Sequence, residues 1–201
     1  MAAVSEAIVR EYFELHGFFV RQQRKYVAPA RREDDEVDFL VINPHPEPGE
    51  TALPFVLAAG DLPRIARAVV VVKGWHTETF STAVLANAPG IFRFVEPAVF
   101  QQATKAFGHD GPLTKILVVP ALPHSAEARA QSIELLRAKG IDAVIPFRTM
   151  LADLIQETEA SRNYEKSDLL QIIRVFKTYD FFREPQLELF KPRRPRKKAK
   201  G

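Results

Sequence analysis

A run of four valines, Val69 to Val72, is the feature that most constrains this chain of 201 residues. When extended, such a run is apolar on both faces, which is typical of a central strand covered on both sides of a sheet. The run is followed directly by Lys73, Gly74 and Trp75, the single tryptophan of the chain. A lysine beside a buried strand is costly unless it has a partner or a chemical role.

The expected partner of Lys73 is an acid in a second apolar segment, residues 36–43. Asp38 lies there among apolar residues, two positions after Glu36. Because side chains two apart on a strand point to the same face, we expect Glu36 and Asp38 to share a face. The sequence therefore predicts that two strands bring Asp38 and Lys73 together. The pair is either a buried salt bridge that fixes strand register or a working or ancestral active site.

Periodicity along the rest of the chain predicts alternating helices and strands. We expect helices at 4–16, 78–88, 96–107, 125–139, 148–157 and 164–182, and strands at 18–27, 36–43, 67–75, 91–95, 115–119 and 141–146. Gly17 is a predicted helix stop, and Ser125 lies at a predicted helix start. The later strand–helix–strand order implies parallel strands joined by right-handed crossovers. We expect one α/β domain over residues 1–183 and a basic, disordered tail over residues 184–201.

The net charge of +3 belongs to that tail and not to the body. Residues 191–201 hold seven cations and no acid, and the remaining residues carry 21 cations against 25 acids. The body therefore does not present a broad phosphate-binding surface. Three roles remain open for the tail: a solvating end, a non-specific phosphate binder or a transport signal.

Several classes of protein are disfavoured by what the sequence lacks. The absence of cysteine excludes disulfides and thiolate metal sites and fits a reducing compartment. The sequence has no signal-peptide pattern and no apolar run of about 20 residues, so we expect a cytoplasmic protein without a membrane partner. Its histidines lack zinc-ligand spacing, and motifs for serine hydrolases, dinucleotide enzymes and nucleotide triphosphatases are missing.

The order of predicted elements is helix, three strands, helix and strand, with an acid on the second strand and a lysine at the end of the third. This order resembles the PD-(D/E)xK nuclease superfamily over roughly residues 4–120, on the segments Glu36-Val37-Asp38-Phe39-Leu40-Val41 and Val71-Val72-Lys73-Gly74-Trp75. The resemblance implies a restriction-endonuclease-like fold, a central mixed sheet flanked by helices, here followed by a C-terminal βαβα extension. It also implies nucleic acid as a partner, and a homodimer.

The chemistry behind the motif combines a metal with a lysine. Carboxylates on neighbouring strands hold Mg²⁺ beside the scissile phosphate, and the metal polarises the phosphate and helps to form hydroxide. The lysine holds that nucleophile and offsets the developing charge. The resemblance assigns the catalytic roles to Asp38, Lys73 and Glu11, which lies on the first helix. It assigns the Mg²⁺ ligands to Asp38 and Glu36.

The sequence departs from this motif at Val71, where an acid is expected two residues before Lys73. Valine cannot bind Mg²⁺, so either Glu36 or Glu11 replaces the missing acid or the site is inactive. His76 and Glu78 are further candidates just past the third strand. We therefore expect a nucleic-acid-associated protein that, if its site is active, is a Mg²⁺-dependent phosphodiester hydrolase. The alternative is a catalytically inactive nuclease-like fold that serves as a nucleic-acid-binding or protein-interaction module.

Nucleic-acid contacts are expected from two groups of cations. The first lies near the first strand and the second in the tail; together they comprise Arg21, Arg24, Lys25, Arg193, Arg194, Arg196, Lys197 and Lys198. Each cation that neutralises a phosphate releases condensed counterions, so binding is expected to weaken with salt. A third reading, from another class, is a small-molecule α/β enzyme with its site at the carboxyl ends of strands around Pro120–Ser125.

Overall fold

The computed structural model describes residues 2–23, 37–47, 49, 52–107 and 112–182. It divides the chain into two compact units, Met1–Glu157 and Thr158–Gly201. The expected boundary between residues 183 and 184 lies outside the described residues. Within the part of the chain that the structure describes, no helix combines the length and the apolar character needed to cross a membrane.

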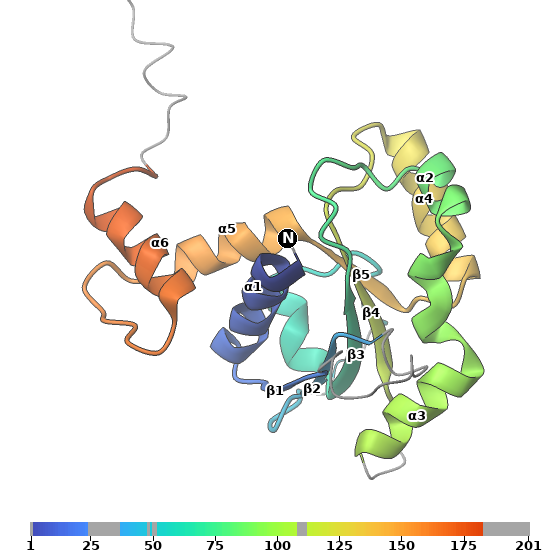
Figure 1. Cartoon of the computed structure of the whole chain (residues 1–201), viewed down its shortest axis with the longest axis horizontal. Coiled ribbons are helices and arrows are strands. Elements are labelled where there is room, and N and C mark those ends of the chain that lie inside the picture. The colour runs from blue at the N-terminus through green and yellow to red at the C-terminus, as the bar shows by residue number, and fades with distance from the viewer. Residues whose placement is uncertain (1, 24–36, 48, 50–51, 108–111, 183–201) are drawn as a thin grey trace, which may run out of the picture. The chain divides into compact units, whose positions relative to one another are not determined.

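The first unit contains a mixed five-stranded sheet flanked by helices (Figure 1). Its elements are α1 (Ala2–Leu15), β1 (Phe19–Gln22), β2 (Phe39–Ile42), the 3-10 helix η2 (Ala59–Arg64), β3 (Arg67–Val72), α2 (Thr82–Asn87), the 3-10 helix η3 (Pro89–Val95), α3 (Pro97–Phe107), β4 (Thr114–Val119), α4 (Ala126–Ala138), β5 (Ala143–Pro146) and α5 (Phe147–Glu157). The strands lie in the order β1-β2-β3-β4-β5. The pairs β1–β2 and β2–β3 are antiparallel, and β3–β4 and β4–β5 are parallel. The expected α/β fold with a mixed, helix-flanked sheet is confirmed.

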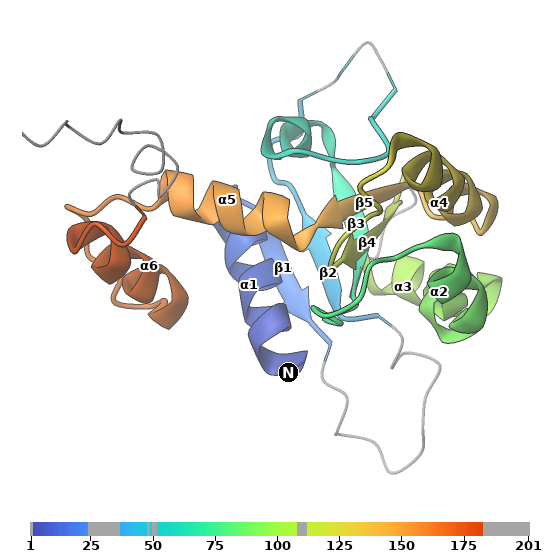
Figure 2. The same ribbon diagram turned by 90° about the horizontal axis from the view of Figure 1, so that it is seen from above.

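Helices cover both faces of the sheet, as the valine run requires. Figure 2 shows α1 and α5 on one side of the strands and α2, α3 and α4 on the other. Val69 and Val71 belong to a buried cluster with Leu117 and residues of α2, η3, α3 and α4. By strand alternation Val70 points to the opposite face, toward α1. β3 is therefore the central, doubly covered strand that the sequence predicts.

Local signals fix the ends of several helices. Gly17, two residues after the end of α1, adopts a left-handed φ of +80°, where a side chain would be strained. The N–H of Phe18 then donates to the Phe13 carbonyl at 3.0 Å, which closes the helix end. At the start of α4, the Ser125 hydroxyl accepts the Ala128 N–H at 3.3 Å. Both predicted helix boundaries are confirmed.

Two local expectations around β3 are wrong. The strand expected at 91–95 is the 3-10 helix η3, with Ile91, Phe92 and Phe94 buried. A short buried apolar run has no periodicity that separates a strand from a helix. In addition, β3 ends at Val72 and α2 begins only at Thr82, so residues 73–81 form a connecting loop and not the predicted strand and helix ends. This loop carries Lys73, Trp75, His76 and Glu78 of the candidate site.

The described part of the second unit is a loop followed by α6 (Asp168–Thr178). The helix is shorter than the expected 164–182, because Ser167 caps its start by accepting the Leu170 N–H at 3.2 Å. Beyond its end, Asp180 adopts a left-handed φ of +58°. The Phe181 N–H donates to the Phe176 carbonyl at 2.9 Å. Exposed apolar side chains of this unit are Ile172, Val175, Phe176, Tyr179, Phe181 and Phe182.

The Tyr12 side chain provides a test of the packing between α1 and the sheet. Tyr12 is fully buried, and its hydroxyl finds no hydrogen-bond partner among the described residues. Burial, and then the charges of Asp153 and Asp61, raise the pKa of Tyr12 above its usual range. A buried hydroxyl without a partner is destabilising, because its hydration is lost without replacement.

We expect Tyr12→Phe to raise the free energy of unfolding by about 1 kcal/mol at neutral pH. The folded pKa of Tyr12 lies above the unfolded value, so the wild type loses stability as the pH rises above about 10. The variant lacks this titration, so its advantage should grow in that range. Urea unfolding followed by Trp75 fluorescence at neutral and alkaline pH measures both effects. A variant less stable than the wild type at both pH values would contradict this prediction.

Candidate functional site

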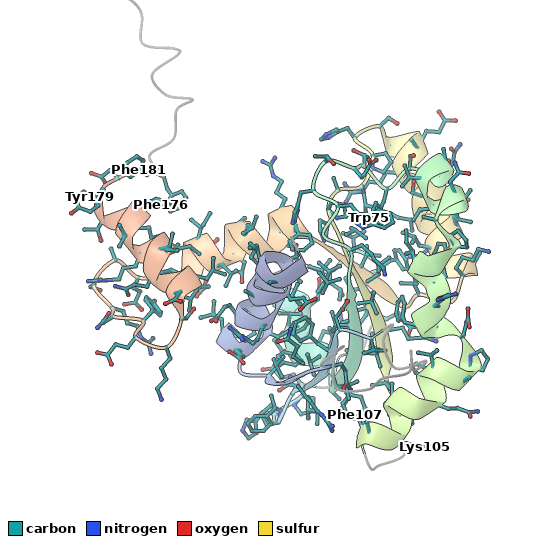
Figure 3. The ribbon with its side chains drawn as sticks, in the orientation of Figure 1. Trp75, Lys105, Phe107, Phe176, Tyr179 and Phe181 are labelled. Atoms are coloured by element: carbon teal, nitrogen blue, oxygen red, sulfur yellow. The ribbon has the colours of Figure 1, made fainter. Side chains whose placement is uncertain are left out.

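A pocket of about 800 Å³ lies at the carboxyl end of β3. Its walls come from the first turns of α1, from the loop after β3 and from α2. Asp38 and Lys73 both line it, and so do Glu6, His76 and Glu78. Figure 3 shows Trp75 beyond the end of β3, on the stretch that leads toward α2. The structure thus brings the predicted acid, directly before β2, and the predicted lysine, directly after β3, to one pocket.

The backbone around Asp38 departs from a regular strand. Phe39 pairs with Val70 in the antiparallel register of β2 and β3, and the Asp38 N–H also donates to the Val70 carbonyl at 3.2 Å. Two residues therefore face one, which is the pairing of a β-bulge. Consistent with this, Val37 and Leu40 belong to the same core cluster although they are three residues apart. An uninterrupted strand would put them on opposite faces.

The bulge fixes the position of the Asp38 carboxylate. Asp38 is buried, and its Oδ2 accepts the backbone N–H of Val72 at 2.6 Å. The side chain thereby takes the donor at the last residue of β3, directly before Lys73. Each carboxylate oxygen has two lone pairs, so this bond does not exhaust what Asp38 can accept.

The backbone on both sides of this donor is also fixed. The Lys73 N–H donates to the Val118 carbonyl of β4 at 3.0 Å, which holds the start of the loop against the parallel part of the sheet. Val71, at the position where the motif has an acid, is only 1% exposed and packs in the core cluster with Val69. Its side chain is therefore part of the core and offers no metal ligand to the pocket.

Helix α1 is joined to the loop by a contact that the sequence analysis did not predict. The Ser5 hydroxyl and His76 Nε2 form a hydrogen bond of 2.9 Å. Between them Gly74 approaches α1 so closely that an added Cβ would lie 2.3 Å from Ser5 Oγ. The His76 ring also packs edge-on against Phe147, with ring centroids 4.6 Å apart. The loop is thus held against α1 at the pocket wall.

A second carboxylate reaches the pocket from α1, and it is Glu6. Gln22 of β1 donates its side-chain amide to Glu6 Oε2 at 2.7 Å, which orients this acid. Glu6 was missed because it has no motif around it. The signal that could have found it is its position one turn from the start of the helix that packs beside Asp38. Asp38, Glu6 and Lys73 therefore all line the same pocket.

The other predicted site residues lie elsewhere or outside the described residues. Glu11 is buried on α1 and pairs with Arg10 Nη2 at 3.3 Å, and it is not among the residues that line the pocket. Glu36, Arg24, Lys25 and the five tail cations fall outside the described residues. Arg21 is exposed and lines a second pocket of about 350 Å³ together with Lys105 and Val37. His124, near the alternative small-molecule site, does not line the pocket at β3.

The donor set decides what metal the pocket could hold. Among the described residues, no group of three or more His, Asp or Glu side chains has the arrangement of a metal site. Mg²⁺, however, keeps several waters and is often bound by one or two carboxylates together with substrate phosphates. Asp38 and Glu6 both line the pocket and are the carboxylates that such a smaller site would use.

Comparisons with known proteins found no match. No protein-family model, no curated protein and no solved structure matches the chain. The site must therefore be interpreted from its own geometry and chemistry.

The hydrogen bond from Val72 to Asp38 makes a prediction about stability. Asp38→Ala leaves the Val72 N–H without its acceptor, and we expect it to cost about 1–3 kcal/mol of unfolding free energy. Asp38→Asn retains a side-chain oxygen and should cost at least about 1 kcal/mol less than the alanine variant. Urea unfolding curves of both variants measure the difference. Equal losses would show that the Val72 bond contributes nothing.

The close approach of Gly74 to Ser5 makes a second prediction about stability. Gly74→Ala should destabilise the first unit by about 1–3 kcal/mol, because the new methyl group overlaps the Ser5 side chain. Gly90→Ala is the matched control, since an added Cβ there meets nothing within 4 Å. Thermal unfolding of the two variants is the measurement. A Gly74 variant as stable as the Gly90 variant would show that the α1 contact is loose.

Proposed function

We propose that the pocket at the end of β3 binds a phosphodiester of nucleic acid and hydrolyses it with Mg²⁺, as in nucleases of the PD-(D/E)xK type. The observation that carries the proposal is that Asp38, directly before β2, and Lys73, directly after β3, line one pocket. Supporting it is the topology, in which three antiparallel strands behind α1 are followed by a parallel crossover. This order is the one that the sequence resemblance implies for a restriction-endonuclease-like fold.

The roles follow from the positions of the side chains. Asp38, held by the Val72 N–H, and Glu6, held by Gln22, are the carboxylates that would hold Mg²⁺. When bound, Mg²⁺ polarises the phosphate and lowers the pKa of a coordinated water. Lys73 supplies a fixed positive charge beside the same pocket, where it can hold the attacking water and offset negative charge on the phosphate. Glu36 and Glu11 remain sequence-based candidates for the second acid.

Cations line a second pocket that includes Val37, the residue before Asp38, and this suggests a path for the rest of the strand. Val37 and Asp38 are neighbours in the sequence, yet Val37 lines the second pocket, whose wall also includes the exposed side chains of Arg21 and Lys105. A polyanion engaging Asp38 therefore has positive charge available on the same unit, and its affinity should fall with salt.

One observation favours a second candidate function, a nuclease-like fold that binds without cleaving. Val71 is packed in the core, so the acid of the motif is lost and its place is filled. In this reading the bond from Val72 to Asp38 has only a structural role, and the pocket recognises a phosphodiester without a metal. Salt-sensitive binding of nucleic acid without cleavage would support this candidate.

The two functions are separated by metal titration and a cleavage assay. Calorimetry with Mg²⁺ and Mn²⁺ should show binding to the wild type that Asp38→Asn loses. Lys73→Ala should retain metal binding but cleave labelled DNA or RNA about 100-fold more slowly, because one charge-stabilising group is lost. Lys166→Ala is the control, since Lys166 is exposed and outside the pocket.

A wild type that binds no metal and cleaves neither DNA nor RNA would overturn the catalytic proposal. Wild-type cleavage that Asp38→Asn and Lys73→Ala leave unchanged would move the active site elsewhere.

A further inference from the structure

The lining of the pocket at β3 combines two kinds of residue. Glu6, Asp38 and Lys73 are charged, and so is Glu78 on the loop before α2. The part toward α2 also includes Trp75, then Ala83, Val84 and Asn87 of α2, and Ala88 directly after that helix. Asn87 is the single polar side chain among the lining residues of α2. A ligand that fits both kinds of residue has an anionic part and a flat apolar part with a hydrogen-bonding edge.

Trp75 is placed to contact such a flat group. Its indole packs edge-on against the Phe80 ring, with centroids 5.7 Å apart and planes at 60°. Phe80 is fully buried, and its N–H donates to the Ala121 carbonyl at 2.9 Å, so the supporting ring is fixed. Trp75 nevertheless remains 41% exposed. The indole therefore packs at one edge against Phe80, lines the pocket and remains partly exposed.

A nucleotide has both of the required parts. Its base stacks on aromatic rings and presents donors and acceptors at its edge, and its phosphate is anionic. The pocket volume of about 800 Å³ is within the range of sites that enclose small ligands. In a duplex, however, the base is paired and stacked, so it cannot enter such a pocket unless it is extruded.

We propose that the pocket binds an unpaired nucleotide, with its base on Trp75, its base edge at Asn87 and its phosphate toward Lys73. This inference rests on the proposed function and narrows its substrate class to single-stranded DNA or RNA. The residues toward α2 select the base, and the charged residues act on the phosphate. The charged residues alone would bind a duplex and a single strand equally well, because both carry phosphates.

Trp75 is the single tryptophan of the chain, so its fluorescence reports the pocket directly. Without metal and at low salt, thymidine and uridine oligomers should quench this fluorescence. A duplex of the same length should bind at least about tenfold more weakly and leave the emission unchanged. Binding is measured separately by the anisotropy of a labelled strand, so that variants without tryptophan can be compared.

Substitutions localise the contact. Trp75→Ala should weaken single-strand binding about tenfold, in line with the loss of one stacked base. Trp75→Phe should recover part of this loss, because it restores an aromatic face. Phe19→Ala is the matched control, since Phe19 is an exposed aromatic residue of the same unit that does not line the pocket. Asn87→Ala should reduce discrimination among the four bases.

The outcomes separate this inference from the proposed function. Equal binding of duplex and single strand, with unchanged emission and an unaffected Trp75→Ala variant, would overturn the inference even if metal-dependent cleavage is found. Quenching by single strands without cleavage would support it and leave only the binding function. Quenching by a mononucleotide alone, with neither polymer bound, would retain the nucleotide pocket and overturn the nucleic-acid function.

Discussion

The hydrogen bond from the Val72 N–H to the Asp38 carboxylate is the interaction on which the candidate site depends. It joins the residue directly before β2 to the last residue of β3 at 2.6 Å, in the place where the bulge interrupts regular pairing. The bulge aims an acid at the end of the central strand, and the acid in turn satisfies a backbone donor that the bulge would leave without a ladder partner. The Asp38 side chain therefore serves both the local structure and the candidate chemistry. Comparing Asp38→Asn with Asp38→Ala separates these two roles.

Much of the fold follows from patterns that act over a few residues. The valine run required cover on both faces, and Gly17 and Ser125 marked helix ends through backbone conformation and capping. The meeting of Asp38 and Lys73 at one pocket was also predicted, because an acid and a lysine at the ends of apolar strands are costly to bury apart.

What the sequence did not reveal depends on contacts across the fold. The bulge at Asp38 has no local signature, since Val37 and Leu40 are both simply apolar. Glu6 and Ser5 reach the pocket only because α1 packs beside β3, and Gly74 was not recognised as the point of close approach. The 3-10 helix at 89–95 was mistaken for a strand, because all-round burial removes the periodicity that separates the two.

The bulge also changes how one-residue insertions and deletions in this region should be understood. A bulge adds one residue to β2 without adding a partner on β3, so the chain gains a side chain while the sheet gains no length. Deleting that residue would leave the ladder from Phe39 onward in register with β3 and would remove the carboxylate. In an evolutionary comparison, a single-residue gap at this position would therefore mark the loss of a site within an unchanged fold. An ordinary loop deletion would carry no such meaning.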